Sequence, residues 1–322
     1  MPEVTYKQQQ MGAPIPVICP HDRALLRHIE GAGYHCDNCQ RQYPVQRGVA
    51  RLLDRNDEFY EGAYQNQVAF LPKDERPWHV WPLWLINSGY PWMVRRHVAP
   101  GSTVVEIGCA GGVRYFGKRY RMIGCDLSRV SLERLETVYT ALLQVDATAC
   151  IALADQSVDA VVSSYFWEHI PPALKPRILS ECARILRPGG KIIFLYDVET
   201  NNPLIRRYKR KAPELYQQLF LDGDGHLGYQ APDENADLFR AAGFSVLEHH
   251  GMEKTWLQST AAYTKLAAFG RKDRRVFGWT KWLDKKPAFY PYTALMRLVD
   301  TVVDPLLPKN WARMDLLVCA KR

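Results

Sequence analysis

Short apolar runs, bounded by glycine, proline or acidic residues, recur through the middle of the chain and predict a sheet of buried strands. Residues 104–107 (VVEI) form one run and lead into a glycine-rich turn. Residues 121–126 (RMIGCD) and 142–146 (LLQVD) form two more, and each ends on a carboxylate. Between them, residues 128–138 predict a helix with Ser128 as its N-cap. This alternation of strands and helices predicts an α/β fold.

The turn after the first of these strands is the most informative local feature. Gly108, Gly111 and Gly112 let the backbone approach a ligand, and Glu106 stands two residues before the first of them. Asp126 follows Gly108 by 18 residues, where a carboxylate can accept hydrogen bonds from ribose hydroxyls. Position 110 is alanine and position 113 is valine, so the strict dinucleotide-binding pattern is not met. A nucleoside cofactor is favoured, and a βα turn that needs small residues only for packing is the alternative.

The spacing E-x-G-x-A-x-G in this turn resembles motif I of class I S-adenosylmethionine (SAM)-dependent methyltransferases. Residues 142–149, 152–170 and 178–196 are similar to later segments of the same family, and the last contains its R-P-G-G turn. The ordered matches span about 95 residues. The resemblance is to the branch typified by enzymes that methylate small molecules and lipids. It implies a Rossmann-like sheet of seven strands with an antiparallel last strand, and SAM as the methyl donor.

The same resemblance implies which side chains hold the cofactor. Asp126 is expected at the ribose and Asp146 at the adenine amino group. The cofactor-binding candidates are Glu106, Gly108, Ala110, Gly112, Asp126, Leu127, Asp146, Ala147 and Tyr165. His169 and His226 are candidates for a general base, which is needed only if the acceptor must lose a proton. A structural role in the pocket is the alternative for both histidines, and Asp197 and Tyr165 are candidates for orienting the acceptor.

The amino-terminal segment predicts a separate metal module. Residues 15–53 resemble small zinc ribbons that occur as methyltransferase activators or fused to methyltransferases. A C-x-x-C knuckle stands at 36–39, and at 19–22 a second knuckle has aspartate in place of its second cysteine. The candidate ligands of one structural zinc are Cys19, Asp22, Cys36 and Cys39, with His21 as the rival fourth ligand. A ribbon that keeps its fold without a metal is the alternative.

Composition and resemblance together divide the chain into five parts. In order, these are a zinc-ribbon-like module at 1–55, a Trp-rich helical linker or cap at 56–100, the SAM-binding core at 101–254, a helical and aromatic insertion at 255–313 and the final core strand at 314–322. We expect Tyr60 and Tyr64 to cover the cofactor. The linker tryptophans, Trp78, Trp81, Trp84 and Trp92, either line the acceptor pocket or pack helices onto the sheet. We expect the insertion to be a helical cap over the acceptor site, with a membrane-surface or subunit contact as the alternative.

Bulk composition adds little to this picture. The chain is 47% hydrophobic and 24% charged, as expected for a globular protein, and it has no run of 18 apolar residues that would span a membrane. The polar amino terminus lacks the apolar core of a signal peptide, and the eight cysteines fit reduced thiols, so we predict a cytoplasmic location. The net charge of +8 includes basic clusters at 206–211 and 271–275, which are either solvated helix faces or a binding patch.

We predict a SAM-dependent methyltransferase that acts by in-line displacement on a small-molecule, sugar or lipid-linked acceptor. One alternative is an RNA base methyltransferase that uses the zinc ribbon and the basic surface, as in the ribosomal guanine-N1 enzymes it resembles. Residues 163–169 (SSYFWEH) lack the N/D-P-P-Y/F motif used on exocyclic base amines, which argues partly against RNA. A further alternative is a non-catalytic scaffold whose ribbon binds a partner, although intact Glu106, Asp126 and Asp146 argue against it.

Overall fold

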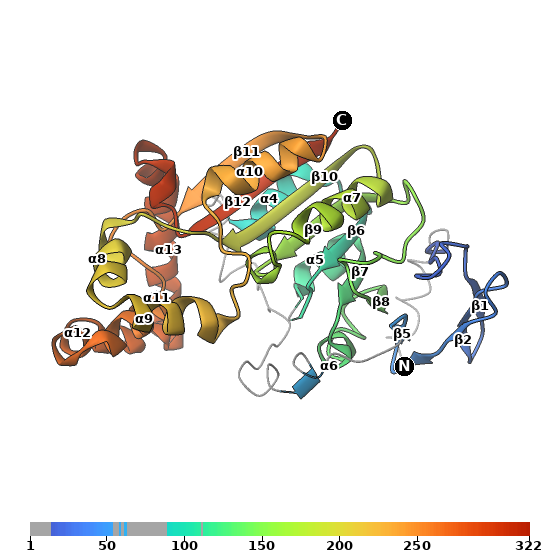
Figure 1. Cartoon of the computed structure of the whole chain (residues 1–322), viewed down its shortest axis with the longest axis horizontal. Helices are drawn as coiled ribbons and strands as arrows, with labels where there is room; N and C mark the ends of the chain where they lie inside the picture. Colours follow the sequence, from blue (N-terminus) through green and yellow to red (C-terminus); the bar gives the residue numbers. More distant parts are fainter. Residues whose placement is uncertain (1–13, 54–57, 59–60, 63–88, 111) are drawn as a thin grey trace.

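A computed structural model describes residues 14–53, 58, 61–62, 89–110 and 112–322 (Figure 1). The predicted roles of Tyr60, Tyr64, Gly111, Trp78, Trp81 and Trp84 fall outside these residues. In the described part of the chain, no helix has the length and apolar character needed to cross a bilayer.

The main sheet has the strand order β11-β12-β10-β9-β6-β7-β8-β5-β4. Its central strands are β6 (Thr103–Ile107), β7 (Arg121–Asp126), β8 (Ala141–Gln144), β9 (Val158–Ser164) and β10 (Leu186–Asp197), which are parallel to one another. At one edge, β12 (Met314–Lys321) is antiparallel both to β10 and to β11 (Phe244–Met252). The predicted antiparallel last strand is therefore present, inserted between its two neighbours.

The predicted count of seven strands is wrong, because the described sheet has nine. The two additional strands, β4 (Val45–Gln46) and β5 (Val49–Arg51), come from the amino-terminal module. Strand β5 runs parallel to β8 and pairs Val49 with Leu142. An uncovered β8 would leave a row of backbone donors and acceptors without partners, and β5 satisfies them. The module thus extends the sheet as well as forming a unit of its own.

Helices cover both faces of the sheet and make a three-layer sandwich (Figure 1). One face carries α7 (Lys175–Ile185) and α10 (Pro232–Ala241), and the other carries α4 (Tyr90–His97), α5 (Arg114–Arg119) and α6 (Arg129–Glu133). Successive strand residues alternate between the two cores: Val104 packs with the second group and Val105 with the first. Both are fully buried, as expected for strands covered on both sides.

The amino-terminal module lies at one end of the molecule, coloured blue in Figure 1. It holds a small antiparallel sheet of β1 (Arg27–Ile29), β2 (Gly33–His35) and β3 (Gln42–Tyr43). Most of its buried side chains, among them Val17 and Tyr43, belong to the same hydrophobic cluster as one face of the main sheet. The module is therefore stabilised by the larger domain, which offsets the small core available to a unit of this size.

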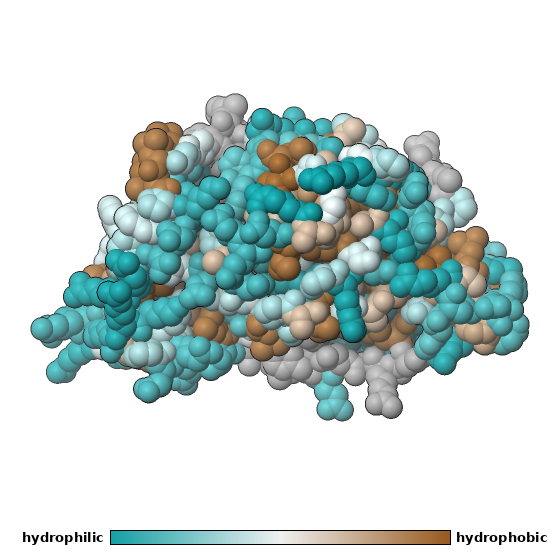
Figure 2. Space-filling model, turned by 45° about the horizontal axis from the view of Figure 1, so that its top comes forward, coloured by the Kyte–Doolittle hydropathy of each residue, from teal (hydrophilic) through white to brown (hydrophobic). Residues whose placement is uncertain are grey.

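A second group of helices forms the opposite end of the molecule (Figure 1). We call residues 203–221 and 255–313 the helical lobe. Its elements are α8 (Pro203–Lys211), α9 (Pro213–Tyr216), η3 (Gln217–Leu221), α11 (Thr260–Leu266), η5 (Ala267–Phe269), α12 (Arg271–Phe277), η6 (Gly278–Asp284), α13 (Lys286–Val302), η7 (Asp304–Leu306) and η8 (Lys309–Trp311). The lobe has its own core, in which Tyr208, Phe220 and Phe269 are buried against one another. Figure 2 shows an apolar patch on the outside of this end.

Candidate active site

A cavity of about 370 Å³ opens where β6, β7, β8 and β9 end. All nine residues predicted to bind the cofactor line it, and so does His169. The crevice outside the carboxyl ends of the strands is where open α/β sheets bind ligands. The structure thus brings the predicted cofactor residues together in one place, although they are spread over 60 positions of the sequence.

Two glycines of the turn after β6 have conformations that other residues rarely adopt. Gly108 has φ +63° and Gly112 has φ +56°. A Cβ atom on Gly108 would lie 2.4 Å from Cδ2 of Phe166, and one on Gly112 would lie 2.5 Å from Cδ2 of Leu135. Both positions therefore require glycine for backbone geometry and for packing. The turn therefore needs glycine for packing, which was the alternative interpretation of its small residues. The same turn also lines the cavity.

Two carboxylates line the cavity at the carboxyl ends of the neighbouring strands β7 and β8. Asp126 accepts a hydrogen bond from the Ala110 N–H at 3.0 Å through one oxygen and from the Ser128 N–H at 2.9 Å through the other. Burial raises the pKa of Asp126 to about 6. Asp146 accepts from the Thr148 N–H at 2.8 Å and from its hydroxyl at 2.7 Å. These bonds fix the carboxylates and tie the glycine turn to the turn after β7.

The carboxylate of Glu106 is held by two tyrosines that sequence reasoning missed. Glu106 is buried and accepts hydrogen bonds from the hydroxyls of Tyr90, at 3.0 Å, and Tyr139. The Tyr139 hydroxyl also accepts the Val113 N–H at 2.9 Å. Burial raises the pKa of both tyrosines well above the usual value, so both remain donors. No local signal marks these tyrosines, because they lie on a helix before β6 and in a loop after α6.

A different set of side chains forms the end of the cavity near β9. Tyr165 follows β9 with φ +58°, a strained value for a residue with a side chain, and its side chain is exposed. Nδ1 of His169 lies 3.0 Å from the Gly225 carbonyl oxygen, which can only accept a hydrogen bond. The proton therefore sits on Nδ1, and Nε2 carries the lone pair of the neutral ring. Burial lowers the pKa of His169, which keeps the ring neutral at pH 7.

His226 packs against His169, with the two ring centroids 5.3 Å apart. Burial and the neighbouring imidazole lower the pKa of His226 to about 4, so this ring is neutral as well. His226 does not line the cavity, whereas His169 does. Glu168, His169 and His226 also form a group with ligand-type atoms within 4.8 Å of one another. Of the two predicted candidates for a base, only His169 reaches the cavity wall.

Buried ion pairs join this end of the cavity to the helical lobe. Arg313 lies between two carboxylates, with Nη1 3.5 Å from Asp197 and Nε 2.7 Å from Glu253. Nε2 of His226 stands 4.0 Å from the same Asp197 and 3.9 Å from Asp224. Sequence reasoning proposed Asp197 as a residue that orients the acceptor, and the structure places it beside the histidine pair. It missed Arg313 and Glu253, which lie far from Asp197 in the sequence.

Comparison with known proteins agrees with this geometry. Residues 105–194 match a family model described as a methyltransferase domain. The chain is 32% identical over 166 residues to the ubiquinone biosynthesis O-methyltransferase of Cupriavidus pinatubonensis, covering 47% of this chain and 64% of that protein. The Burkholderia thailandensis protein of the same name is 27% identical over 174 residues, covering 50% and 72%. A tRNA (carboxymethyluridine(34)-5-O)-methyltransferase of Mus musculus is 36% identical over 119 residues, covering 35% and 18%.

Residues 105–194 are thus similar to a methyltransferase domain, and the curated relatives that overlap this range are methyltransferases. The prediction of a SAM-dependent methyltransferase is thereby confirmed. The matched range begins inside β6 and ends inside β10, so it contains the strands that line the cavity. The helical lobe lies outside that range.

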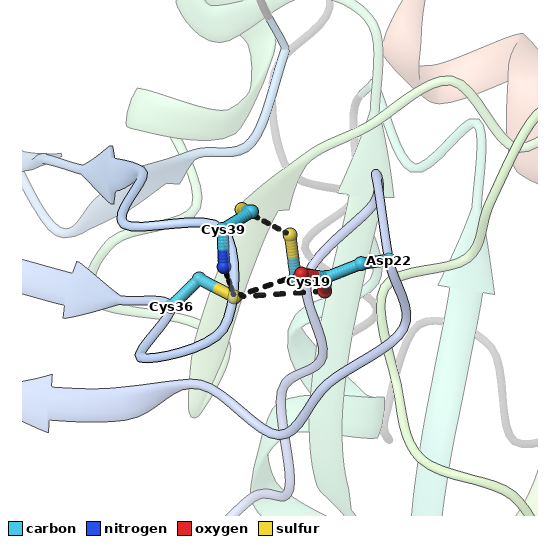
Figure 3. A group of neighbouring side chains, drawn as sticks. All are labelled: Cys19, Asp22, Cys36 and Cys39. Atoms are coloured by element: carbon cyan, nitrogen blue, oxygen red, sulfur yellow. Dashed lines mark hydrogen bonds between the residues drawn. The ribbon is translucent and has the colours of Figure 1, made fainter.

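A second cluster of side chains, of the types that bind metals, lies in the amino-terminal module. Cys19, Asp22, Cys36 and Cys39 offer four ligand-type atoms within 4.8 Å of one another (Figure 3). Sγ of Cys19 is 3.6 Å from Sγ of Cys39, and Sγ of Cys36 is 3.3 Å from an oxygen of Asp22. His21, the rival fourth ligand, is exposed and does not belong to this group. The structure thus assembles the predicted set that contains the aspartate.

The two knuckles of this module have the same backbone geometry. Arg23 and Gln40, each one residue after the second ligand position, both have positive φ, at +63° and +60°. The N–H of Cys19 bonds to the carbonyl of the residue five positions later, and the N–H of Cys36 does the same, at 2.8 and 2.9 Å. Asp22 therefore occupies in one knuckle the position that Cys39 occupies in the other.

Proposed function

We propose that this methyltransferase transfers the methyl group of SAM to a hydroxyl of a small-molecule or lipid-linked acceptor. The observation that carries the proposal is that the nine predicted cofactor residues and His169 line one cavity. The glycine turn and Asp126 suit the methionine and ribose parts of the donor, and Asp146 suits the adenine. Two relatives are named as O-methyltransferases of ubiquinone biosynthesis, which supports an oxygen acceptor. The chain spans 64% of the length of the first of them, so the acceptor itself is part of the proposal.

Bound SAM supplies an activated methyl group that is open to in-line attack. The residues of the chain then have two tasks. The cavity walls align the acceptor oxygen behind the methyl carbon, which by itself lowers the barrier substantially. Nε2 of His169 accepts the proton that the hydroxyl loses, because Nδ1 already donates to Gly225. The carboxylates of Asp224 and Asp197 lie near the histidine pair, where they favour the positive charge that His169 gains.

The experiment that tests this acceptor class is transfer of a tritiated methyl group. Purified enzyme and labelled SAM are incubated with separated RNA, protein, organic-soluble and water-soluble small-molecule fractions from cells in which the gene is deleted. We expect label in the organic-soluble or small-molecule fraction, and none when His169→Asn replaces the native chain. Label confined to RNA would overturn the proposal in favour of a nucleic-acid acceptor. That second candidate is motivated by the tRNA methyltransferase relative, although this chain covers only 18% of that protein.

We also propose that the amino-terminal module holds one structural zinc. Tetrahedral ligands at the usual Zn–S distance of about 2.3 Å stand about 3.7 Å apart, which fits the spacing of Cys19 and Cys39. Asp22 accepts hydrogen bonds from the Ala24 N–H at 3.0 Å and from Nδ2 of Asn38 at 2.8 Å. Bonds of this kind hold a metal-binding carboxylate in the orientation that the metal requires. The zinc would fix both knuckles and take no part in methyl transfer.

Elemental analysis of the purified chain tests this site directly. We expect about one zinc per chain, retained in Asp22→Cys and lost in Asp22→Ala. Asp37→Ala is the matched control, because Asp37 lies in the same module and outside the ligand group. Native protein with much less than one metal per chain would refute the zinc proposal and leave the methyltransferase proposal untouched.

We propose a cytoplasmic location as well. All eight cysteines are free thiols, and seven of them are buried. Free buried thiols fit a reducing compartment. Disulfide-bonded cysteines in protein isolated from cells with alkylated thiols would contradict this location.

A further inference from the structure

The helical lobe exposes far more apolar surface than the rest of the described chain. Fifteen large hydrophobic side chains are exposed in the described chain, and ten of them belong to residues 256–306. Trp256 is 75% exposed, Trp279 63% and Leu306 83%. Figure 2 shows one part of this surface as a compact apolar patch at the lobe end. Scattered single apolar residues are normal on a protein surface, but a gathering of this kind marks a contact site.

Helix α13 contributes an apolar stripe to this surface. Leu295, Leu298 and Val302 are exposed and spaced three and four residues apart, so they share one face. The polar residue Asp300 is buried instead, where it accepts a hydrogen bond from the Glu253 N–H at 3.0 Å. Although Met296 is buried on the other side of α13, this exposed face is apolar where a surface helix normally carries polar side chains. A face of this composition is suited to an apolar environment.

The same lobe carries the positive charge of the chain. Residues 203–221 contain five basic and one acidic side chain, and residues 255–313 contain eleven basic and four acidic ones. The lobe therefore has a formal charge of +11, and since the whole chain has +8, the remainder has −3. The basic clusters noted in the sequence, at 206–211 and 271–275, both belong to it.

Basic and apolar side chains are interleaved in one short segment of the lobe. Residues 274–286 run from the second half of α12 through η6 to the first residue of α13. Its exposed residues include Arg274, Arg275, Val276, Trp279, Lys281, Trp282 and Lys285. Tryptophan beside lysine and arginine is the composition of segments that lie at the interface of anionic bilayers, where rings enter the headgroup region and cations pair with phosphates. We call residues 274–286 the docking segment.

We propose that the docking segment and the exposed face of α13 bind the surface of an anionic membrane. Charge complementarity favours this occupant over a second copy of the chain, because a symmetric contact would bring two +11 lobes together. The aliphatic stripe of Leu295, Leu298 and Val302 favours it over RNA, since RNA offers phosphates and base faces but no aliphatic layer. The proposal concerns a partner and does not depend on the proposed acceptor.

Docking of the lobe would bring the cavity close to the membrane surface. Lys265 on α11 forms an ion pair with Asp224, which adjoins the His169–His226 pair. Arg313 at the end of the lobe pairs with Asp197 beside the same histidines. The lobe is thereby fixed to the acceptor end of the cavity. An acceptor held in the membrane would reach this end without first entering the bulk solvent.

Vesicle flotation with the full-length chain tests this proposal. The probes are vesicles of equal parts phosphatidylglycerol and phosphatidylcholine, and vesicles of phosphatidylcholine alone. We expect the chain to float with the anionic vesicles and to stay in solution with the neutral ones. Arg274→Glu/Arg275→Glu should weaken binding to the anionic vesicles by at least about tenfold. Trp279→Ser/Trp282→Ser should also abolish most of the binding.

Two matched variants serve as controls for these changes. Leu247→Ser removes an exposed apolar side chain from β11, and Lys118→Glu/Arg177→Glu reverses two exposed charges on α5 and α7. Both should float like the native chain. Thermal unfolding, followed by circular dichroism, checks that every variant is folded without reference to SAM or methyl transfer.

Four results would overturn the proposal. The first is no flotation of the native chain with anionic vesicles. The second is flotation that the docking-segment variants reduce no more than the controls do. The third is a native dimer in analytical ultracentrifugation that Trp279→Ser/Trp282→Ser dissociates, which would assign the face to a second copy. The fourth is displacement of the native chain from the anionic vesicles by RNA, which would assign the face to nucleic acid.

Discussion

The two ends of the cavity are built in different ways. At the donor end, Glu106, Gly108, Asp126 and Asp146 come from consecutive strands and their turns, within 41 positions of one another. At the acceptor end, His169 packs against His226, which lies beside Asp197, and a buried ion pair joins Asp197 to Arg313. The donor end is a local feature of the βαβ fold, whereas the acceptor end is assembled by tertiary packing of the lobe. A donor site can therefore be shared by many enzymes while the acceptor differs.

The comparison predicts its largest effect at the acceptor end. His169→Asn removes the proton acceptor and should lower kcat by about 100- to 10,000-fold, the usual contribution of a general base. The affinity for SAM should stay within about twofold, since the donor residues are untouched. Steady-state kinetics with the acceptor and calorimetry with SAM measure the two quantities. His28→Asn, in the amino-terminal module, is the control. A kcat reduced by less than tenfold would assign His169 a structural role.

The ion pairs that assemble the acceptor end predict a loss of stability. Arg313→Met leaves Asp197 and Glu253 buried without their cation and should lower the free energy of unfolding by about 3–5 kcal/mol. Arg177→Met removes an exposed arginine on α7 and should change it by less than about 0.5 kcal/mol. Urea unfolding measures both. A loss for Arg313→Met no greater than for its control would mean that the lobe is held by its apolar contacts alone.

At the donor end, removal of a single carboxylate should lower the affinity for SAM and have little effect on the turnover of bound SAM. Asp126→Ala should weaken SAM binding by about 1–3 kcal/mol, because it leaves the ribose hydroxyls without their acceptor and releases the two backbone N–H groups through which Asp126 fixes the turns of the donor site. Asp155→Ala, which removes an exposed carboxylate paired with Arg184, is the control and should bind SAM normally. Equal affinities of the two variants would show that the ribose contact is wrongly assigned.

The smallest predicted effect is a pH dependence confined to the donor end. Burial raises the pKa of Asp126 to about 6, so the free protein holds the ionised, accepting form above that pH and loses it below. SAM affinity should therefore be constant above about pH 7 and fall by about tenfold between pH 7 and pH 5. In Asp126→Asn this dependence should disappear. A pH profile that is the same in both proteins would assign the titration to another group.

The sequence was sufficient for the donor end because its signals are local. The turn at Gly108, the acids at Asp126 and Asp146 and the alternation of core strands with helices all follow from short segments read in order. Strands β4 and β5 were missed because two- and three-residue strands carry no periodic pattern. Arg313 was missed because it meets Glu253 across 60 positions and Asp197 across 116. Contacts over such separations follow from the folded topology and leave no trace in local spacing.

The amino-terminal module shows a third relation between sequence and structure. Its ligand spacing was readable, but the choice between His21 and Asp22 was not, since both side chains bind zinc. The fold separates them, because Asp22 takes the position equivalent to Cys39, whereas His21 is exposed and does not belong to the group. Backbone geometry, repeated in the two knuckles, makes the distinction that composition could not.

The central claim is that the glycine turn and its carboxylates form a SAM site, and calorimetric titration of the purified chain with SAM tests it most directly. We predict one binding event per chain with a micromolar Kd, and an affinity reduced by about 5- to 150-fold in Asp126→Ala. No binding by the native chain at tens of micromolar SAM would contradict the account.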